Sequence, residues 1–222
     1  MSPEDQSALM ELYANPAPYL SEQALARSKA IIECTNPEEA LYFIGSGQDF
    51  DQIALPAILE FEHRLSGVSC VWTKVARHGM PSGMRLFDLR WSYVEAPVTN
   101  APVAILCQTI LADEMEAVVA AATIWDRVKP SKILVLTEFA NRAVIRNLGI
   151  MARANSIELV ALACRVVDIS LRNVRSDIEA ALDTRDVKSA PLLSRWLAAR
   201  AIGPDPRPQN RVSLQRRSGK FG

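Results

Sequence analysis

PVAILCQTILADEMEAVVAAATIWDRVKPSKILVL, residues 102–136, is the stretch of this sequence that decides the fold. Its first apolar run, 103–107, is short and partly β-branched, which is typical of a buried strand. Apolar residues then recur at steps of three and four through 114–128, so they share one face of a predicted helix. Pro130 ends that helix, and 133–136 is a second apolar run suited to a parallel neighbouring strand.

The loop between this strand and this helix, residues 108–113, is the first candidate for a binding site. In a strand–helix–strand unit with parallel strands, such a loop lies at the carboxyl edge of the sheet. Because α/β proteins bind their ligands at that edge, we expect the ligand of this protein to lie there.

Strands and helices alternate through the rest of the chain in the same way. Further strands are predicted at 41–44, 68–75, 86–94 and 157–163, and further helices at 49–65, 141–148, 174–182 and 192–201. This alternation predicts an α/β fold with a doubly wound, mostly parallel sheet flanked by helices. The strands on either side of the polar, glycine-rich segment 77–83 predict a hairpin flap over the sheet edge.

Two N-terminal helices are predicted before the first strand, at 4–14 and 21–33. Ser2 with Asp5 three residues later caps the first, Ser21 followed by Glu22 opens the second, and Asn15-Pro16-Ala17-Pro18 separates them. The chain is therefore divided into a helical extension (1–40), an α/β domain (41–202) and a flexible basic tail (203–222).

The tail gives a candidate interaction surface. Three prolines lie between 204 and 208, and the bases of the tail are Arg207, Arg211, Arg216, Arg217 and Lys220. These bases suit nucleic acid or an acidic protein, although a solubilising terminus is the commoner role of such a segment.

Composition narrows the class of protein. With 49% hydrophobic and 23% charged residues among 222, the chain is in the ordinary globular range. No apolar run approaches the roughly 18 to 20 residues of a membrane span, and no secretory signal is recognisable, which predicts a cytoplasmic protein without membrane contact. Cys34, Cys70, Cys107 and Cys164 lie far apart and three of them fall within apolar runs, so buried free thiols are predicted rather than disulfides or metal ligands.

A second candidate loop is Gly45-Ser46-Gly47, directly after the strand predicted at 41–44. Glycines let backbone amides approach an anion, so Gly45 and Gly47 could cradle a phosphate. A tight turn is the simpler interpretation, because the glycine pattern is incomplete and Asp49 and Asp51 follow it.

The predicted flap has basic character, with Arg77, His78, Arg85 and Arg90 in or beside it. Solvated charges are the plainer interpretation of such a cluster. The only histidines are His63 and His78, so the sequence offers no Ser/His/Asp set, and His78 would need partners to act as a general acid or base.

The order of elements resembles the type I phosphoribosyltransferase fold, in particular its uracil phosphoribosyltransferase-like branch, over residues 41–169. The runs that carry the resemblance are RLFDLRWSYVEAPVTNAPVAILCQTILADEMEAVVAAATIW (85–125) and LVLTEFANRAVIRNLGIMARANSIELVALACRVVDI (134–169). In that branch a flap and a strand lead to a DPMLATGGSA-type loop, which holds the 5-phosphate of phosphoribosyl pyrophosphate. The resemblance implies the same fold and a homodimer.

The residues of that loop differ from the family pattern. Gln108 and Thr109 begin it, Gln108 in place of the leading aspartate. Glu114 replaces a glycine, and Asp113 and Glu116 replace the threonine and serine donors. Each carboxylate would add on the order of 1 to 4 kcal/mol of repulsion toward a phosphate at near contact, against roughly 0.3 to 2 kcal/mol of attraction from the helix N-terminus. We therefore expect phosphoribosyl pyrophosphate to bind poorly.

Three functional hypotheses follow. The first is a phosphoribosyltransferase-like protein that has lost ordinary phosphoribosyl transfer and acts as a binding or assembly module, with no catalytic residue assigned. The second is an active or repurposed enzyme on a nucleobase, a nucleotide or another phosphorylated ligand, with Asp113, Glu114, Glu116 and Asp49 or Asp51 as oxygen ligands for Mg²⁺. The third is binding of nucleic acid or protein through the basic tail.

Overall fold

The fold was analysed in a computed structural model, which describes residues 1–47, 50–76, 85–100, 102–182 and 195–202. Its strands are β1 (Leu41–Ser46), β2 (Leu65–Val75), β3 (Phe87–Val94), β4 (Val103–Leu111), β5 (Lys132–Asn141) and β6 (Glu158–Val167). They form one sheet of six strands in the order β3-β2-β1-β4-β5-β6. Every neighbouring pair is parallel except β2 and β3, which are antiparallel. The predicted α/β fold with a mostly parallel sheet is confirmed.

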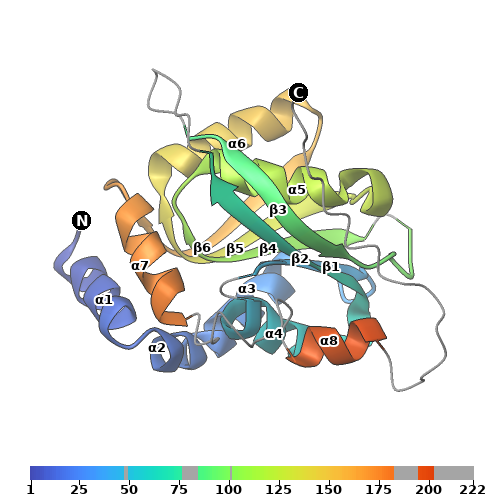
Figure 1. The fold of residues 1–222 in the computed structure, drawn as a ribbon, viewed down its shortest axis with the longest axis horizontal. Coiled ribbons are helices and arrows are strands. Elements are labelled where there is room, and N and C mark those ends of the chain that lie inside the picture. The colour runs from blue at the N-terminus through green and yellow to red at the C-terminus, as the bar shows by residue number, and fades with distance from the viewer. Residues whose placement is uncertain (48–49, 77–84, 101, 183–194, 203–222) are drawn as a thin grey trace, which may run out of the picture.

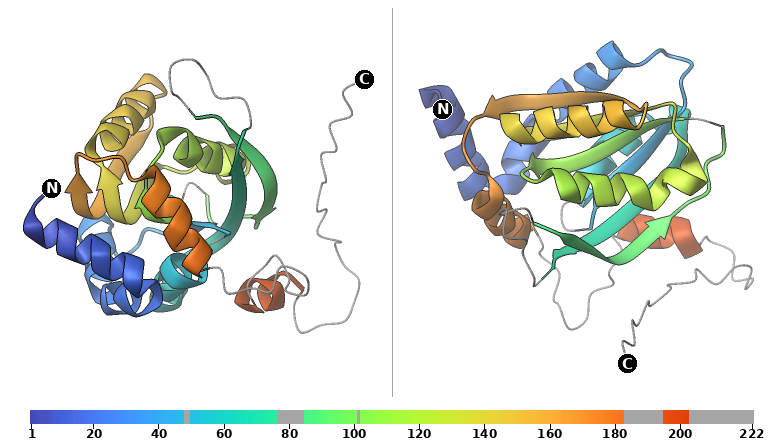
Figure 2. Two further views of the ribbon diagram at one scale, coloured as in Figure 1. Left: turned by 60° about the vertical axis from the view of Figure 1, so that its left-hand side comes forward. Right: turned by 90° about the horizontal axis from the view of Figure 1, so that it is seen from above.

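Helices cover both faces of this sheet (Figure 1). They are α1 (Pro3–Ala14), α2 (Pro16–Glu22), α3 (Ala24–Cys34), α4 (Phe50–Glu60), α5 (Glu114–Val128), α6 (Arg142–Ala154), α7 (Arg172–Leu182) and α8 (Arg195–Ile202). In Figures 1 and 2, α5 and α6 lie on one face, while α1 to α4 and α8 lie on the other. This is the doubly wound arrangement that the alternating pattern predicts.

Alternate side chains of β1 fill the two layers of the core. Phe43 belongs to the layer that contains Leu12 and Ile31 of the N-terminal helices, whereas Ile44 belongs to the layer that contains Ile124 of α5. All five of these side chains are fully buried. The period of two along a strand places neighbouring residues on opposite faces, so one short apolar strand supplies both layers.

The N-terminal helices differ in part from the sequence prediction. The Ser2–Asp5 capping box is confirmed, with the Ser2 hydroxyl accepting from the Asp5 amide at 3.1 Å. The prediction of a loop at Asn15-Pro16-Ala17-Pro18 is wrong, because Pro16 occupies the first position of α2. Proline is tolerated there since the first helical amides have no intrahelical acceptor. Ser21 consequently lies inside α2 and does not begin the next helix.

The central strands are longer than predicted. β4 continues through Leu111 and pairs with β5, with Ile110 opposite Phe139 and Leu111 opposite Ala140. The predicted loop 108–113 is therefore wrong in its extent, since only Ala112 and Asp113 connect β4 to α5. The apolar side chains of Ile110 and Leu111 account for this extension, because both are buried in the core.

The cysteines also differ in part from expectation. All four are free, and Cys70 and Cys107 are buried as predicted. Cys34 is only half-buried, and Cys164 is exposed, because β6 is an edge strand of the sheet. Among the helices that the structure describes, none has the length and apolar content to cross a bilayer.

Candidate functional site

The two candidate loops of the sequence meet at one point of the sheet. β1 and β4 are parallel neighbours, with Gly45 opposite Cys107, and the strand order runs outward from this pair in both directions. The crevice outside the carboxyl ends of two such strands is where doubly wound proteins bind ligands. The register therefore places Gly45 beside Cys107, directly before Gln108 of β4.

Gln108 and Thr109 are part of the sheet itself. Both are buried in β4, and Gln108 lies opposite Thr137 of β5. The carbonyl of Thr109 accepts a hydrogen bond from the Thr137 hydroxyl at 3.2 Å. Backbone groups that belong to a ladder of this kind are not exposed as donors for a ligand.

Gly45 and Gly47 make room for two aromatic rings. A Cβ on Gly45 would lie 2.2 Å from Cδ2 of Phe50, and a Cβ on Gly47 would lie 1.9 Å from Nε1 of Trp72. The amide of Gly47 donates to the carbonyl of Val71 at 2.9 Å, so it is occupied within the protein. Close packing against the rings accounts for both glycines without an anion.

We expect Gly47→Ala to lower the free energy of unfolding by about 1 to 3 kcal/mol, because the new methyl group forces the Trp72 ring out of its position. Gly149→Ala in α6 is the matched control, since its Cβ would meet only Arg153 Nη1 at 3.9 Å. That control should be neutral or stabilising by up to about 1 kcal/mol. Urea unfolding of both variants measures the difference, and equal stabilities would contradict the packing argument.

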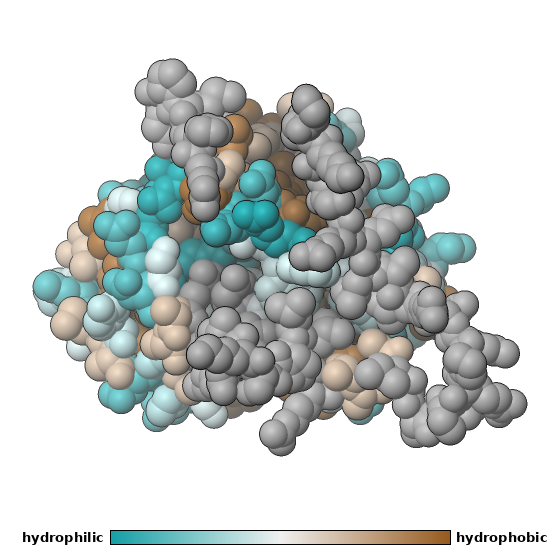
Figure 3. Space-filling model, viewed as in Figure 1, coloured by the Kyte–Doolittle hydropathy of each residue, from teal (hydrophilic) through white to brown (hydrophobic). Residues whose placement is uncertain are grey.

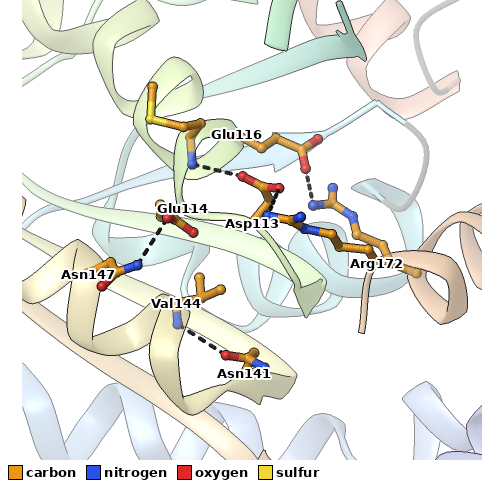
Figure 4. Close-up of polar contacts among 9 residues, drawn as sticks. Asp113, Glu114, Glu116, Asn141, Val144, Asn147 and Arg172 are labelled. Atoms are coloured by element: carbon orange, nitrogen blue, oxygen red, sulfur yellow. Dashed lines mark hydrogen bonds and ion pairs between the residues drawn. The ribbon is translucent and has the colours of Figure 1, made fainter. Parts of the chain in front are cut away.

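The three carboxylates at the start of α5 point to three different partners (Figure 4). Asp113 caps the helix, accepting from the Met115 amide at 3.3 Å. Glu114 accepts from Nδ2 of Asn147 on α6 at 3.0 Å. Glu116 turns the other way, toward the β2–β3 side, and accepts from the Thr73 hydroxyl at 2.5 Å. The carboxylates therefore do not converge on one position.

Two arginines from α7 neutralise two of these carboxylates. Arg172 Nη2 lies 3.0 Å from Asp113 Oδ2, and Arg175 donates to Glu116. Arg175 and Glu116 are both nearly buried, with side-chain exposures of 7% and 9%. The position that the sequence predicts for a phosphate is thus lined by ion pairs formed within the chain.

Sequence reasoning missed Arg172 and Arg175. Arg172 precedes the helix predicted at 174–182 and Arg175 lies in its first turn; in the structure α7 begins at Arg172, and the spacing of three residues places both arginines on one helical face. Nothing local to the sequence connects them with residues 113–116, about sixty positions earlier, because the folding of the sheet alone brings α7 to this edge.

Burial raises the pKa of the Asp113 carboxyl, and the nearby guanidinium of Arg172 opposes this effect without cancelling it. The folded pKa is therefore above the ordinary value of 3.8. Asp113 accordingly favours the folded state most below pH 3.8, and that contribution is lost as the pH rises through the folded pKa.

We expect Asp113→Asn to gain stability relative to the unsubstituted protein as the pH rises from about 3.5 toward 6, because asparagine avoids the cost of a buried charge. Asparagine also caps helices well, so the α5 terminus is retained. Urea unfolding at several pH values gives the difference between the two proteins. A difference that does not change with pH would show that burial of the carboxylate carries no penalty.

A small cavity of about 180 Å³ adjoins this cluster, between α7, the start of α5 and the β2–β3 pair. Its charged lining residues in the described part of the chain are four basic and two acidic: Lys74, Arg85, Arg172, Arg175, Asp113 and Glu116. Neither Lys74 nor Arg85 has an ion-pair partner in the described part of the chain. In Figure 3, hydrophilic residues gather over the β2–β3 pair. The cavity is net basic, contrary to the acidic site that the loop sequence predicts.

The other described residues considered from the sequence, His63 and Asp51, do not line this cavity. Asp49, Arg77, His78 and the bases of residues 203–222 lie outside the described residues. His63 is exposed in a short 3₁₀ turn (Glu62–Arg64). Asp51 is exposed in the first turn of α4. No group of three or more His, Cys, Asp or Glu side chains suited to a metal ion is found in the described ranges.

The fold and the site define a doubly wound α/β protein with a polar, charge-paired cluster at the end of its central strands. No protein-family model matches the sequence, and no curated protein matches it either.

Solved structures of similar chain path include the AQ2163 protein from Aquifex aeolicus, with 12% identity over 75% of this chain and 85% of that one, at a TM-score of 0.49. Adenine phosphoribosyltransferase from Thermoanaerobacter pseudethanolicus is 11% identical over 68% of this chain and 83% of that one, with a TM-score of 0.42. Adenine phosphoribosyltransferase from Leishmania donovani is 10% identical over 85% of this chain and 78% of that one, with a TM-score of 0.45. At TM-scores below 0.5, these similarities carry no conclusion about the function of this chain.

Proposed function

We propose that this chain is a phosphoribosyltransferase-like protein that does not carry out ordinary phosphoribosyl transfer and acts as a binding or assembly module. The observation that carries the proposal is the pairing of Asp113 with Arg172 and of Glu116 with Arg175. These ion pairs occupy the place where the resemblance puts the 5-phosphate of phosphoribosyl pyrophosphate.

The backbone at this place supports the same conclusion. A phosphate bound at a helix start needs free amides and a loop without bulky side chains. Here β4 carries ladder pairing as far as Leu111, and the first helical turn presents Glu114 in place of a glycine and Glu116 in place of a serine. An incoming phosphate would have to separate two ion pairs, and it would then face the released carboxylates.

The test is calorimetric titration with phosphoribosyl pyrophosphate in the presence of Mg²⁺, together with an assay for released pyrophosphate. We expect no binding at micromolar concentrations, and no pyrophosphate release with uracil, adenine or hypoxanthine. Micromolar binding, or release with any nucleobase, would overturn the proposal.

A second candidate function is the binding of a small anion in the basic cavity. Its support is the excess of bases over acids in the lining, with Lys74 and Arg85 not paired among the described residues. A volume of about 180 Å³ is below the usual range of roughly 300 to 1,000 Å³ for drug-sized ligands. The ligand class would therefore be a small phosphorylated or carboxylated compound.

Thermal unfolding with millimolar inorganic phosphate tests this second candidate. We expect a rise in Tm that is lost in the Lys74→Ala/Arg85→Ala double variant and reduced by added salt. Arg90→Ala on β3 is the control, because its side chain is exposed and does not line the cavity. The same rise in the double variant would exclude the cavity as the anion site.

A further inference from the structure

Helix α5 carries two apolar stripes, one buried in the core and one only partly buried against it. The buried stripe is Ala117, Ala120, Ile124 and Val128. The second stripe is Val118, Ala121, Ala122 and Trp125, which repeats at three- and four-residue steps and remains at least partly exposed. Val118, Ala121 and Trp125 pack against the core with only part of their surface, and the apolar part that stays exposed is available for a further contact.

The second stripe lines a pocket of about 460 Å³ between α5 and α6. The right-hand view of Figure 2 shows these two helices side by side over the sheet. Leu106, Ile133 and Val135 of the sheet also line the pocket, as do Leu148 and Met151 of α6.

Alanines account for the space between the two helices. Ala121 and Ala122 on α5 and Ala152 on α6 stand where larger side chains would fill the gap. The volume lies in the range of pockets that hold small molecules, and a mainly apolar lining with few polar groups is typical of them.

The two polar residues of the lining both supply acceptors. Asp126 is exposed and has no ion-pair or hydrogen-bond partner among the described residues. Nδ2 of Asn155 donates one of its hydrogens to the Met151 carbonyl at 2.8 Å, and its Oδ1 accepts from no described residue, so Oδ1 is available to a donor of a ligand. Among the described residues, none that lines the pocket is basic.

We propose that this pocket binds a small organic cation, an ammonium group on an aliphatic or aromatic body. The body would occupy the apolar floor, and the ammonium would lie against the acceptors of Asp126 and Asn155. This site is separate from the cavity beside Glu116, since the two share no lining residue. Binding of a cation in this pocket is also independent of the proposed function, because it requires no residue of the cluster around Glu116.

The experiment uses n-octylamine, 1-octanol and octanoate as probes of one chain length, with thermal unfolding and calorimetry as readouts. We expect n-octylamine to bind about three- to fivefold more tightly than 1-octanol, and octanoate to bind most weakly. Asp126→Asn should remove the preference for the ammonium while 1-octanol binding stays unchanged.

Ala122→Phe should weaken all three probes by about tenfold, because the ring enters the pocket from an exposed position. Ala154→Phe is its matched control, being exposed on α6 and outside the lining. Equal binding by the two phenylalanine variants, or no preference for the ammonium in the unsubstituted protein, would overturn the proposal. A dimer in solution that Ala122→Phe dissociates would also overturn it, since the stripe would then bind a second copy of the chain.

Discussion

Replacing Glu138 by glutamine is expected to lower the free energy of unfolding by about 3 to 5 kcal/mol. Glu138 on β5 is fully buried and forms an ion pair with Arg27 of α3, which is 2% exposed. Glutamine preserves the volume of the side chain but leaves the guanidinium of Arg27 buried without a counter-charge. Removal of one partner of a buried pair is costly for that reason.

The surroundings of Arg27 offer little compensation. Its second terminal nitrogen donates to the carbonyl of Leu20 at 2.6 Å, so one side chain connects α2, α3 and β5. Movement of Arg27 toward water would separate the N-terminal helices from the sheet, and these helices bury Leu12, Leu20 and Ile31 in the core. We therefore expect the helices and the sheet to unfold together.

Glu33→Gln provides a matched control for this prediction, because it makes the same chemical change in an exposed pair on α3. Lys29 Nζ and Glu33 Oε1 are 3.8 Å apart, and both side chains are more than half exposed. The expected loss is below about 0.5 kcal/mol. Urea unfolding monitored by fluorescence and by circular dichroism measures both variants. A loss below about 1 kcal/mol for Glu138→Gln would show that water reaches Arg27 in the folded protein.

The neighbourhood of Glu138 also decides the chemistry of Cys164. Partial desolvation and the nearby Glu138 carboxylate raise the pKa of the Cys164 thiol to about 12. The thiol therefore stays protonated at neutral pH, although the residue is exposed. Because the thiolate is the reactive form, Cys164 is a poor nucleophile.

The local features of the fold could be predicted from the sequence. The helix predicted at 114–128 coincides with α5 (Glu114–Val128), and the Ser2–Asp5 cap is present. Both depend on residues within a few positions of one another, where helical periodicity and capping chemistry act. The parallel order of the central strands followed from the alternation of elements.

Features that depend on distant residues could not be predicted. The acidic residues Asp113, Glu114 and Glu116 predict a site that repels phosphate, because carboxylates stand where the loop that the sequence resembles has small and hydroxyl residues. The structure places Arg172 and Arg175 against them, and the lining of the adjoining cavity is net basic. The sign of the local charge thus depends on where α7 packs, and no local pattern encodes that position.

The extent of the strands illustrates the same limit. The pairing between β4 and β5 continues to Leu111 and Ala140, and each of these residues lies four positions beyond the predicted end of its strand. A polar residue such as Gln108 looks like a strand end in the sequence, yet it is buried inside the sheet at 2% exposure. Pairing with a neighbouring strand, rather than local polarity, decides where such a strand ends.

Replacing Glu116 by glutamine is expected to lower the free energy of unfolding by about 2 to 4 kcal/mol. Glu116 accepts hydrogen bonds from Arg175 and from Thr73, so its charge joins α5 to α7 and to β2. Arg175→Met should cost a similar amount, since it leaves Glu116 as the unpaired charge. Because both changes break the same pair, the double variant should be clearly more stable than the sum of the single losses implies.

Arg142→Met is the matched control for the arginine change, because Arg142 pairs with Asp168 at 2.8 Å on the surface, where both side chains are more than half exposed. Its expected cost is below about 1 kcal/mol. Urea unfolding of the four proteins of the cycle yields the coupling energy between Glu116 and Arg175. Strict additivity would show that the two charges act independently, and that α7 does not stabilise the start of α5 through this pair. A coupling energy of about 1 to 3 kcal/mol would instead support the proposal that Arg175 of α7 supplies the counter-charge to Glu116 at this site.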